Sequence, residues 1–207
     1  MWCYVNFRSV ITVIRLNNRQ TGATMTVKKF YKTEAEFARF YAGLKLMHCP
    51  HCRHCGCLIL HGYLKGFADA EGSCQIKRGR RVFCSNRNKK DGCGRTFSLL
   101  MTTFIRRFRL PATALWRFLD NIRVGKNKIR AFADAGSALG QTSCYRLYQL
   151  FKQSQVRIRT RLSQIKPPPL ADTHYPVIQT IEHLAAVFDG HDCPVAQFQY
   201  CFQSSFL

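Results

Sequence analysis

The chain has 207 residues, of which 46% are hydrophobic, so it can fold around a core and is not a disordered tail. It carries 32 Lys and Arg against 11 Asp and Glu, a formal net charge of +21. A compact protein with this excess repels itself, which predicts a polyanionic partner and makes double-stranded DNA the first candidate.

Residues 1–44 form an N-terminal segment that contains one predicted helix. Thr33 suits an N-cap, and Glu36 three residues later completes a capping box. The apolar positions that follow at helical spacing are Phe37, Phe40, Tyr41 and Leu44. This pattern predicts a short amphipathic helix whose apolar side packs against the protein.

Residues 45–98 hold seven of the 11 cysteines and predict a small β zinc ribbon. Two strand-like runs, 58–63 and 80–83, alternate with glycines that mark turns.

Residues 99–166 have helical character. Leu115, Phe118, Leu119 and Ile122 recur at helical spacing, a second helix spans 126–135, and a third begins near Gln141 and continues to Leu162. Three helices with a glycine-bearing turn before the third predict a helix-turn-helix.

Residues 167–207 form a tail that begins with three consecutive prolines. It contains four acidic residues and no Lys or Arg. We expect two helices here. The last presents one apolar face, made of Val195, Phe198, Phe202 and Phe206. This face could bind a recombinase or a second copy of the chain, or it could pack into its own core. Together the segments predict a mainly α fold with a small β zinc ribbon.

The cysteine spacing predicts one structural Zn²⁺, bound by Cys49, Cys52, Cys84 and Cys93. Two intervening residues let the first pair reach one ion, whereas eight residues separate the second pair. Gly92 and Gly94 supply the backbone freedom that this second knuckle needs. Several nearby side chains could replace a ligand or build a second site: Cys55, Cys57, Cys74, His48, His51 and His54. We expect Cys55 and Cys57 to fill small buried positions instead.

A resemblance follows from three stretches: Cys-Pro-His-Cys52, Arg-Gly-Arg-Arg-Val-Phe-Cys84 and Gly-Cys93-Gly-Arg-Thr-Phe-Ser98. Residues 45–165 resemble the zinc ribbon and helix-turn-helix of bacterial insertion-sequence transposases and their accessory proteins. The resemblance implies that the two modules together recognise the DNA ends of a mobile element. The long spacing of the second cysteine pair and the surplus cysteines depart from the family pattern.

The third predicted helix has an apolar stripe that packs inward. If this helix reads DNA, the residues on its opposite side therefore face the bases. The expected base-facing residues are Gln141, Thr142, Ser143, Tyr145, Arg146 and Gln149. The expected backbone contacts are Lys126, Lys128, Arg130, Lys152, Arg157 and Arg159, with Arg78, Arg80, Arg81 and Arg95 on the ribbon.

The 11 acidic residues are scattered over all segments, so we expect no carboxylate triad, no catalytic domain and no enzymatic activity. The predicted function is zinc-dependent, sequence-specific binding of double-stranded DNA, as the DNA-binding or accessory subunit of a mobile element that acts with a separate recombinase. A stand-alone phage or plasmid transcription regulator is the alternative, and an RNA-binding zinc ribbon is a weaker one.

No apolar run reaches the length of a membrane span, and no export signal is convincing. We therefore expect no membrane partner and a place in the bacterial cytoplasm, associated with the nucleoid.

Overall fold

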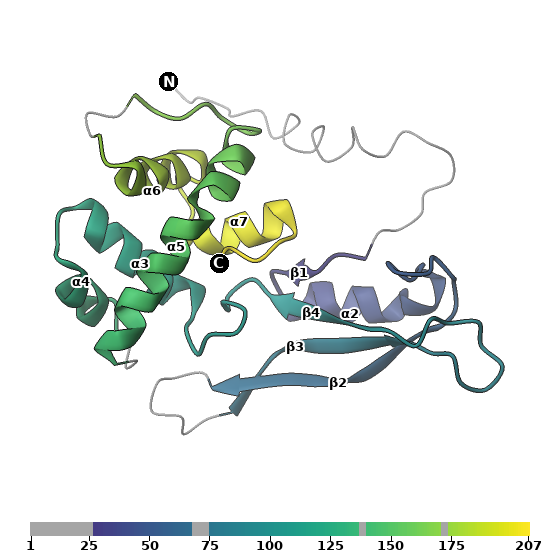
Figure 1. The fold of residues 1–207 in the computed structure, drawn as a ribbon. Coiled ribbons are helices and arrows are strands. Elements are labelled where there is room, and N and C mark those ends of the chain that lie inside the picture. The colour runs from purple at the N-terminus through teal and green to yellow at the C-terminus, as the bar shows by residue number, and fades with distance from the viewer. Residues whose placement is uncertain (1–26, 68–74, 137–139, 171–173) are drawn as a thin grey trace.

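A computed structural model describes residues 27–67, 75–136, 140–170 and 174–207 (Figure 1). The elements in chain order are β1 (Phe30–Tyr31), α2 (Glu34–Ala42), a 3₁₀ turn η1 (Leu44–Leu46), β2 (Leu58–Phe67), β3 (Gln75–Cys84), β4 (Thr96–Met101), α3 (Ala112–Arg123), α4 (Lys128–Asp134), α5 (Gln141–Leu162), α6 (Pro176–Val187) and α7 (Pro194–Phe202).

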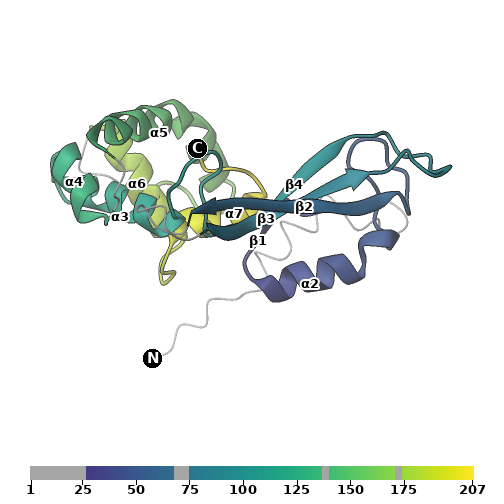
Figure 2. The same cartoon turned by 90° about the horizontal axis from the view of Figure 1, so that it is seen from below.

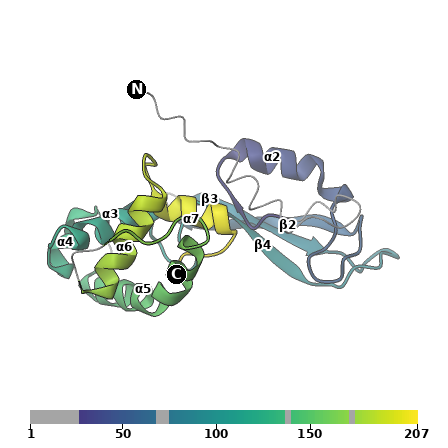
Figure 3. The same cartoon turned by 90° about the horizontal axis from the view of Figure 1, so that it is seen from above.

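The four strands form one mixed sheet in the order β1-β4-β3-β2. The pairs β2–β3 and β3–β4 are antiparallel, whereas β1 runs parallel to β4. Helix α2 lies against one face of this sheet (Figures 2 and 3). The core between them buries Phe37 and Phe40 of α2 against Val82 and Leu99 of the sheet.

The start of α2 confirms the predicted N-cap. The Thr33 side chain accepts a hydrogen bond from the Glu36 backbone N–H at 3.2 Å. The Glu36 carboxylate accepts one from the Lys32 N–H at 2.7 Å and another from the Tyr200 hydroxyl at 2.8 Å. Because Tyr200 belongs to α7, the C-terminal segment holds the first turn of α2 in place.

Helices α3 to α7 form a second lobe around one buried cluster that extends from Ile105 to Phe206. The periodic positions of α3 are buried as predicted: Leu115, Phe118, Leu119 and Ile122. The C-terminal stripe also packs into this core, because Val195, Phe198 and Phe206 are fully buried. The structure therefore assigns that face to the protein's own core, one of the three alternatives for the tail.

Helix α7 joins the two lobes and lies between them in all three views (Figures 1, 2 and 3). The buried Gln199 amide donates to the carbonyls of Thr102 at 2.8 Å and Phe104 at 3.1 Å. The side-chain amide oxygen (Oε1) of Gln203, just after α7, accepts from the backbone N–H groups of Lys29 and Phe30.

The predicted fold class is wrong. Of the residues that the structure describes, 19% are in strands or bridges and 44% are helical, so the protein is a sheet-containing α/β fold. The sheet is larger than expected because β2 and β3 continue well beyond the apolar runs, and because β1 pairs with β4 across some 70 residues of chain. A separate three-helix helix-turn-helix is also wrong, since α3, α4 and α5 share their core with α6 and α7. None of the helices in the described ranges is both long enough and apolar enough to span a membrane.

Candidate metal centre and nucleic-acid interface

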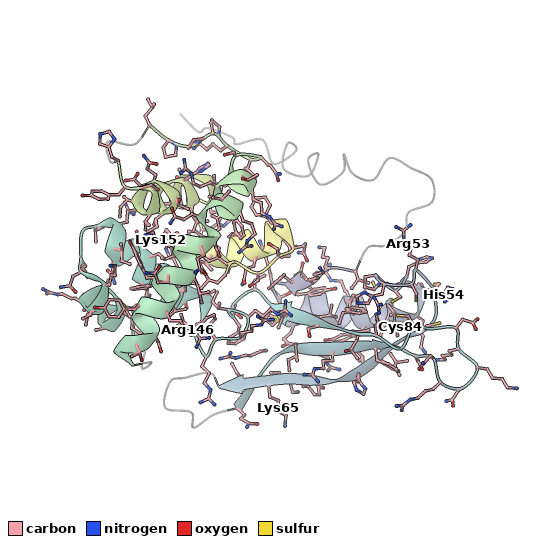
Figure 4. All side chains as sticks on the ribbon, viewed as in Figure 1. Arg53, His54, Lys65, Cys84, Arg146 and Lys152 are labelled. Atoms are coloured by element: carbon pink, nitrogen blue, oxygen red, sulfur yellow. The ribbon has the colours of Figure 1, made fainter. Side chains whose placement is uncertain are left out.

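The four predicted cysteines meet at the end of the sheet that is farther from the helical lobe. Cys49 and Cys52 lie in the turn before β2, Cys84 ends β3, and Cys93 precedes β4. Figure 4 shows Cys84 at this end, close to Arg53 and His54. The Sγ atoms of Cys49 and Cys93 are 3.8 Å apart, those of Cys52 and Cys84 are 3.6 Å apart, and all four lie within 4.8 Å of one another.

These separations match a tetrahedral metal site. Four thiolates at about 2.3 Å from one zinc ion would have their sulfurs about 3.8 Å apart. Two of the cysteines are buried and two are half-buried, which leaves little room for a fifth ligand. The four side chains could therefore hold one metal ion in a closed site.

Backbone hydrogen bonds shape the first knuckle. The Cys49 N–H donates to the His54 carbonyl at 3.0 Å, and the Arg53 N–H donates to the Cys49 carbonyl at 2.9 Å. Arg53 closes this turn with a φ of 63°, in the left-handed region. The His51 N–H points at the Cys49 sulfur at 3.4 Å, which would stabilise a thiolate.

The second knuckle accommodates its eight-residue spacing through a loop held at its base. The Gly94 N–H donates to the Cys84 carbonyl at 3.0 Å, and the Cys93 N–H points at the Cys84 sulfur at 3.4 Å. Gly92 is required for this closure, because a Cβ there would lie 2.1 Å from the Ser85 carbonyl oxygen. The predicted role of the glycines thus rests on close backbone approach at Gly92 and on a positive φ at Gly94.

The thiols respond differently to this environment. Burial raises the pKa of Cys49 and of Cys84. The backbone N–H of His54, helped by the neighbouring sulfurs, lowers the pKa of Cys52 to about 6. Four thiolates this close repel one another unless a cation lies between them, so a bound metal ion would favour the fully deprotonated set.

The surplus cysteines and histidines stay outside this group. Among the described residues, only the four cysteines come together in metal-binding geometry. Cys57 is buried in the core beneath α2, as expected, whereas Cys55 is exposed and the expectation of a buried position for it is wrong. His54 contacts the Asp91 carbonyl through Nδ1, which ties the two knuckles together. Cys74 lies outside the described residues.

Two of the four ribbon arginines predicted to contact DNA have structural partners. The Arg80 guanidinium lies 4.5 Å from the Tyr41 ring and 4.1 Å from the Tyr63 ring, and it donates to the Tyr63 hydroxyl at 2.6 Å. Arg78 donates to the Phe108 carbonyl and stacks on Phe104, and so links the sheet to the helical lobe. Arg81 and Arg95 are exposed.

Helix α5 turns the predicted stripe inward, because Cys144, Leu147 and Phe151 are fully buried. The expected base-facing residues on the other side are exposed, apart from the half-buried Ser143: they are Thr142, Tyr145, Arg146 and Gln149. The Gln141 side chain lies outside the description. Figure 4 shows Arg146 and Lys152 on α5, with Arg146 on the side of the helix nearer the sheet.

The remaining basic residues differ in exposure and in their partners. Arg130 and Lys152 are exposed, and Arg159 is half-buried. Lys126 pairs with Asp134 at 2.8 Å, and the Lys128 ammonium lies 4.6 Å from the Tyr148 ring.

Arg157, predicted to contact a phosphate, has partners within the protein. It donates to the carbonyls of Ser205 and Phe206, each at 2.6 Å. It therefore fastens the chain end to α5.

Sequence reasoning missed Lys65, Arg106 and Arg107, which lie where the sheet meets the helical lobe. The basic run Arg106-Arg107-Phe108-Arg109 was the available signal. In the part of the chain that the structure describes, two ion pairs form: Arg123 with Asp120, and Lys126 with Asp134. The exposed Arg81 of the sheet and the exposed Arg146 and Lys152 of α5 take part in neither pair.

Comparison of the chain with protein-family models, with curated proteins and with solved structures found no match.

Proposed function

We propose that this protein binds double-stranded DNA, and that one zinc ion held by Cys49, Cys52, Cys84 and Cys93 keeps its basic sheet folded. The observation that carries the proposal is the distribution of charge. The chain has a net charge of +21, yet exposed residues such as Arg81, Arg146 and Lys152 form none of the described ion pairs. A polyanion would neutralise such exposed positive charges.

Zinc is the metal that best suits four cysteine thiolates in a closed, tetrahedral arrangement. A closed site has no open position for water or substrate, which favours a structural ion. The knuckles lack an extended core of their own, so metal binding would supply of order 10 kcal/mol of folding free energy.

Helix α5 is the proposed element for contacts with the duplex. Thr142, Tyr145, Arg146, Gln149 and Lys152 project from its exposed side. Arg and Gln can pair bidentately with guanine and adenine edges, while Lys contacts phosphates.

A salt titration of duplex binding tests this proposal. If about eight phosphates are neutralised, the logarithm of the association constant falls with log salt at a slope of about −7. The double variant Arg146→Gln/Lys152→Gln should bind less tightly, and loss of the Lys152 phosphate contact should reduce the slope by about one. The matched control is Arg39→Gln/Lys45→Gln, which removes two exposed charges from α2 and η1. A nearly flat response, or equal losses in both double variants, would contradict the proposal.

The biological setting is proposed from the resemblance to insertion-sequence proteins. The protein would bind the ends of a mobile element and act with a separate recombinase. Footprinting on the DNA that flanks its gene tests this setting. Protection of inverted repeats supports it, whereas protection of a promoter alone favours a transcription regulator.

A further inference from the structure

The face of the sheet opposite α2 has the chemistry of a second binding surface. Side chains alternate along β4, so Leu99 and Met101 enter the core beneath α2 while Ser98 and Leu100 point to the other face. Arg81 pairs with Ser98 across the ladder, and Phe83 pairs with Thr96. These side chains therefore share the open face. Figures 2 and 3 show α2 on the far side of the sheet from it.

Two adjoining hollows lie along this face and share Ser98, Leu100 and Arg106. The smaller, of about 240 Å³, reaches Leu64, Lys65 and Arg107. The larger, of about 530 Å³, reaches the sheet edge at Lys29 and Phe30 and the first knuckle at His51.

The lining of the hollows combines an apolar floor with a basic rim. Leu64, Leu100 and Phe30 supply the floor, and Lys29, Lys65, Arg106 and Arg107 supply positive charge. Among the described residues that line them, none is acidic. Such a surface suits a ligand that alternates flat apolar rings with anionic groups, which is the chemistry of a nucleic-acid strand.

Two aromatic side chains, His61 and Phe83, lie on the same face nearer the metal end. The rings of His61 and Phe83 are 5.6 Å apart, and the Arg87 guanidinium lies 5.9 Å from the Phe83 ring. His61 is exposed and Phe83 is half-buried. Aromatic side chains on an uncovered sheet are sites where unpaired bases stack.

We propose that this open face binds a single strand of DNA that extends from the duplex. His61 and Phe83 stack on its bases, and Arg81, Arg106 and Arg107 contact its phosphates. The hollows fit this occupant, because cavities of a few hundred Å³ admit single bases or nucleotides and exclude a base-paired helix. The inference rests on the proposed DNA binding and identifies the form of DNA that this second surface accepts.

The test compares a blunt duplex with the same duplex carrying a single-stranded tail of about eight nucleotides. Fluorescence anisotropy measures both dissociation constants with the full chain loaded with zinc. We expect the tail to tighten binding about fivefold or more, the effect of gaining one base–aromatic stack.

Two variants test the residues. His61→Ala, and separately Arg81→Gln/Arg106→Gln, should remove this gain, so that the tailed and the blunt duplex bind equally tightly. The control pair Arg39→Gln/Lys45→Gln should keep it. These variants are expected to fold, because the substituted side chains are all exposed: His61, Arg81, Arg106, Arg39 and Lys45.

The two proposals fail in different ways. Binding of the blunt duplex with no gain from the tail overturns the single-strand inference alone. The same holds if the gain survives in both test variants, or if an RNA tail binds more tightly than the DNA tail. Absence of any salt-dependent binding to the blunt duplex overturns the proposed function itself.

Discussion

Replacing Arg157 separates its structural role from DNA binding. Both of its terminal nitrogens donate to backbone carbonyls at the chain end, to Ser205 and to Phe206 at 2.6 Å. These bonds hold Phe206 in the core, where its ring lies 5.9 Å from Phe151 and 5.2 Å from Phe198. Arg157→Gln is shorter and neutral, so it cannot reproduce both bonds.

The expected cost follows from those two bonds. A hydrogen bond from a charged donor contributes about 1.5–3 kcal/mol when water cannot replace it. Arg157 is only half-buried, so water will compensate for part of the loss. We therefore expect Arg157→Gln to lower the free energy of unfolding by about 2–4 kcal/mol, which is less than two such hydrogen bonds would contribute in full.

Urea unfolding and duplex binding, measured on the same samples, check this result. At a temperature where the variant is folded, its DNA affinity and salt slope should equal those of the unsubstituted protein. Lys152→Gln on the same helix should do the opposite: stability changes by less than about 0.5 kcal/mol, while the salt slope falls by about one. Unchanged stability together with weakened DNA binding in Arg157→Gln would refute the structural role and restore the phosphate contact predicted from the sequence.

Three further predictions concern the metal knuckle and the junction between lobes. Gly92→Ala places a Cβ 2.1 Å from the Ser85 carbonyl oxygen, so we expect it to weaken metal binding in a competition with a chelator; an unchanged affinity would mean that the loop closes another way. Gln199→Leu leaves the Thr102 and Phe104 carbonyls without their donor, and it should lower the thermal midpoint at a cost of about 2–4 kcal/mol, with unaltered stability as the contrary result. Acidification should release the metal reversibly. Burial raises the pKa of Cys49 and of Cys84, so protons compete increasingly for these sulfurs as pH falls. A chromogenic zinc indicator would detect the release.

The cluster of four cysteines could be predicted from the sequence because its signal is local. Two close cysteines, a second pair and flanking glycines restrict the geometry without knowledge of the rest of the fold. The same holds for the helices, since the buried positions of α3 and α5 follow the 3.6-residue period. The Thr33 cap was also predictable, because its partner Glu36 is three residues away.

The sheet and the lobe junction depend on contacts between distant residues. The pairing of Phe30 with Leu100, and the hydrogen bonds of Gln199 to residues 102 and 104, have no local signature. The protein partners of Arg80 and Arg157 were not predicted for the same reason. A basic side chain that stacks between Tyr41 and Tyr63, or that binds the chain end, has the same sequence signal as one that faces phosphate.

The open face of the sheet illustrates a further limit. Phe83 and Arg81 are separated by one residue in β3, and their shared side follows from strand alternation once the strand is known. Their neighbours Leu100 and Arg106 join them only through the β3–β4 pairing and the loop that follows β4.

The most direct test of the central claim is the duplex-DNA affinity of one preparation before metal removal, after removal and after zinc is added back. We predict one zinc per chain, a large loss of affinity on removal because the sheet end unfolds, and recovery with zinc. An affinity that is unchanged by removal of the ion, or four cysteines that bind no zinc, would contradict it.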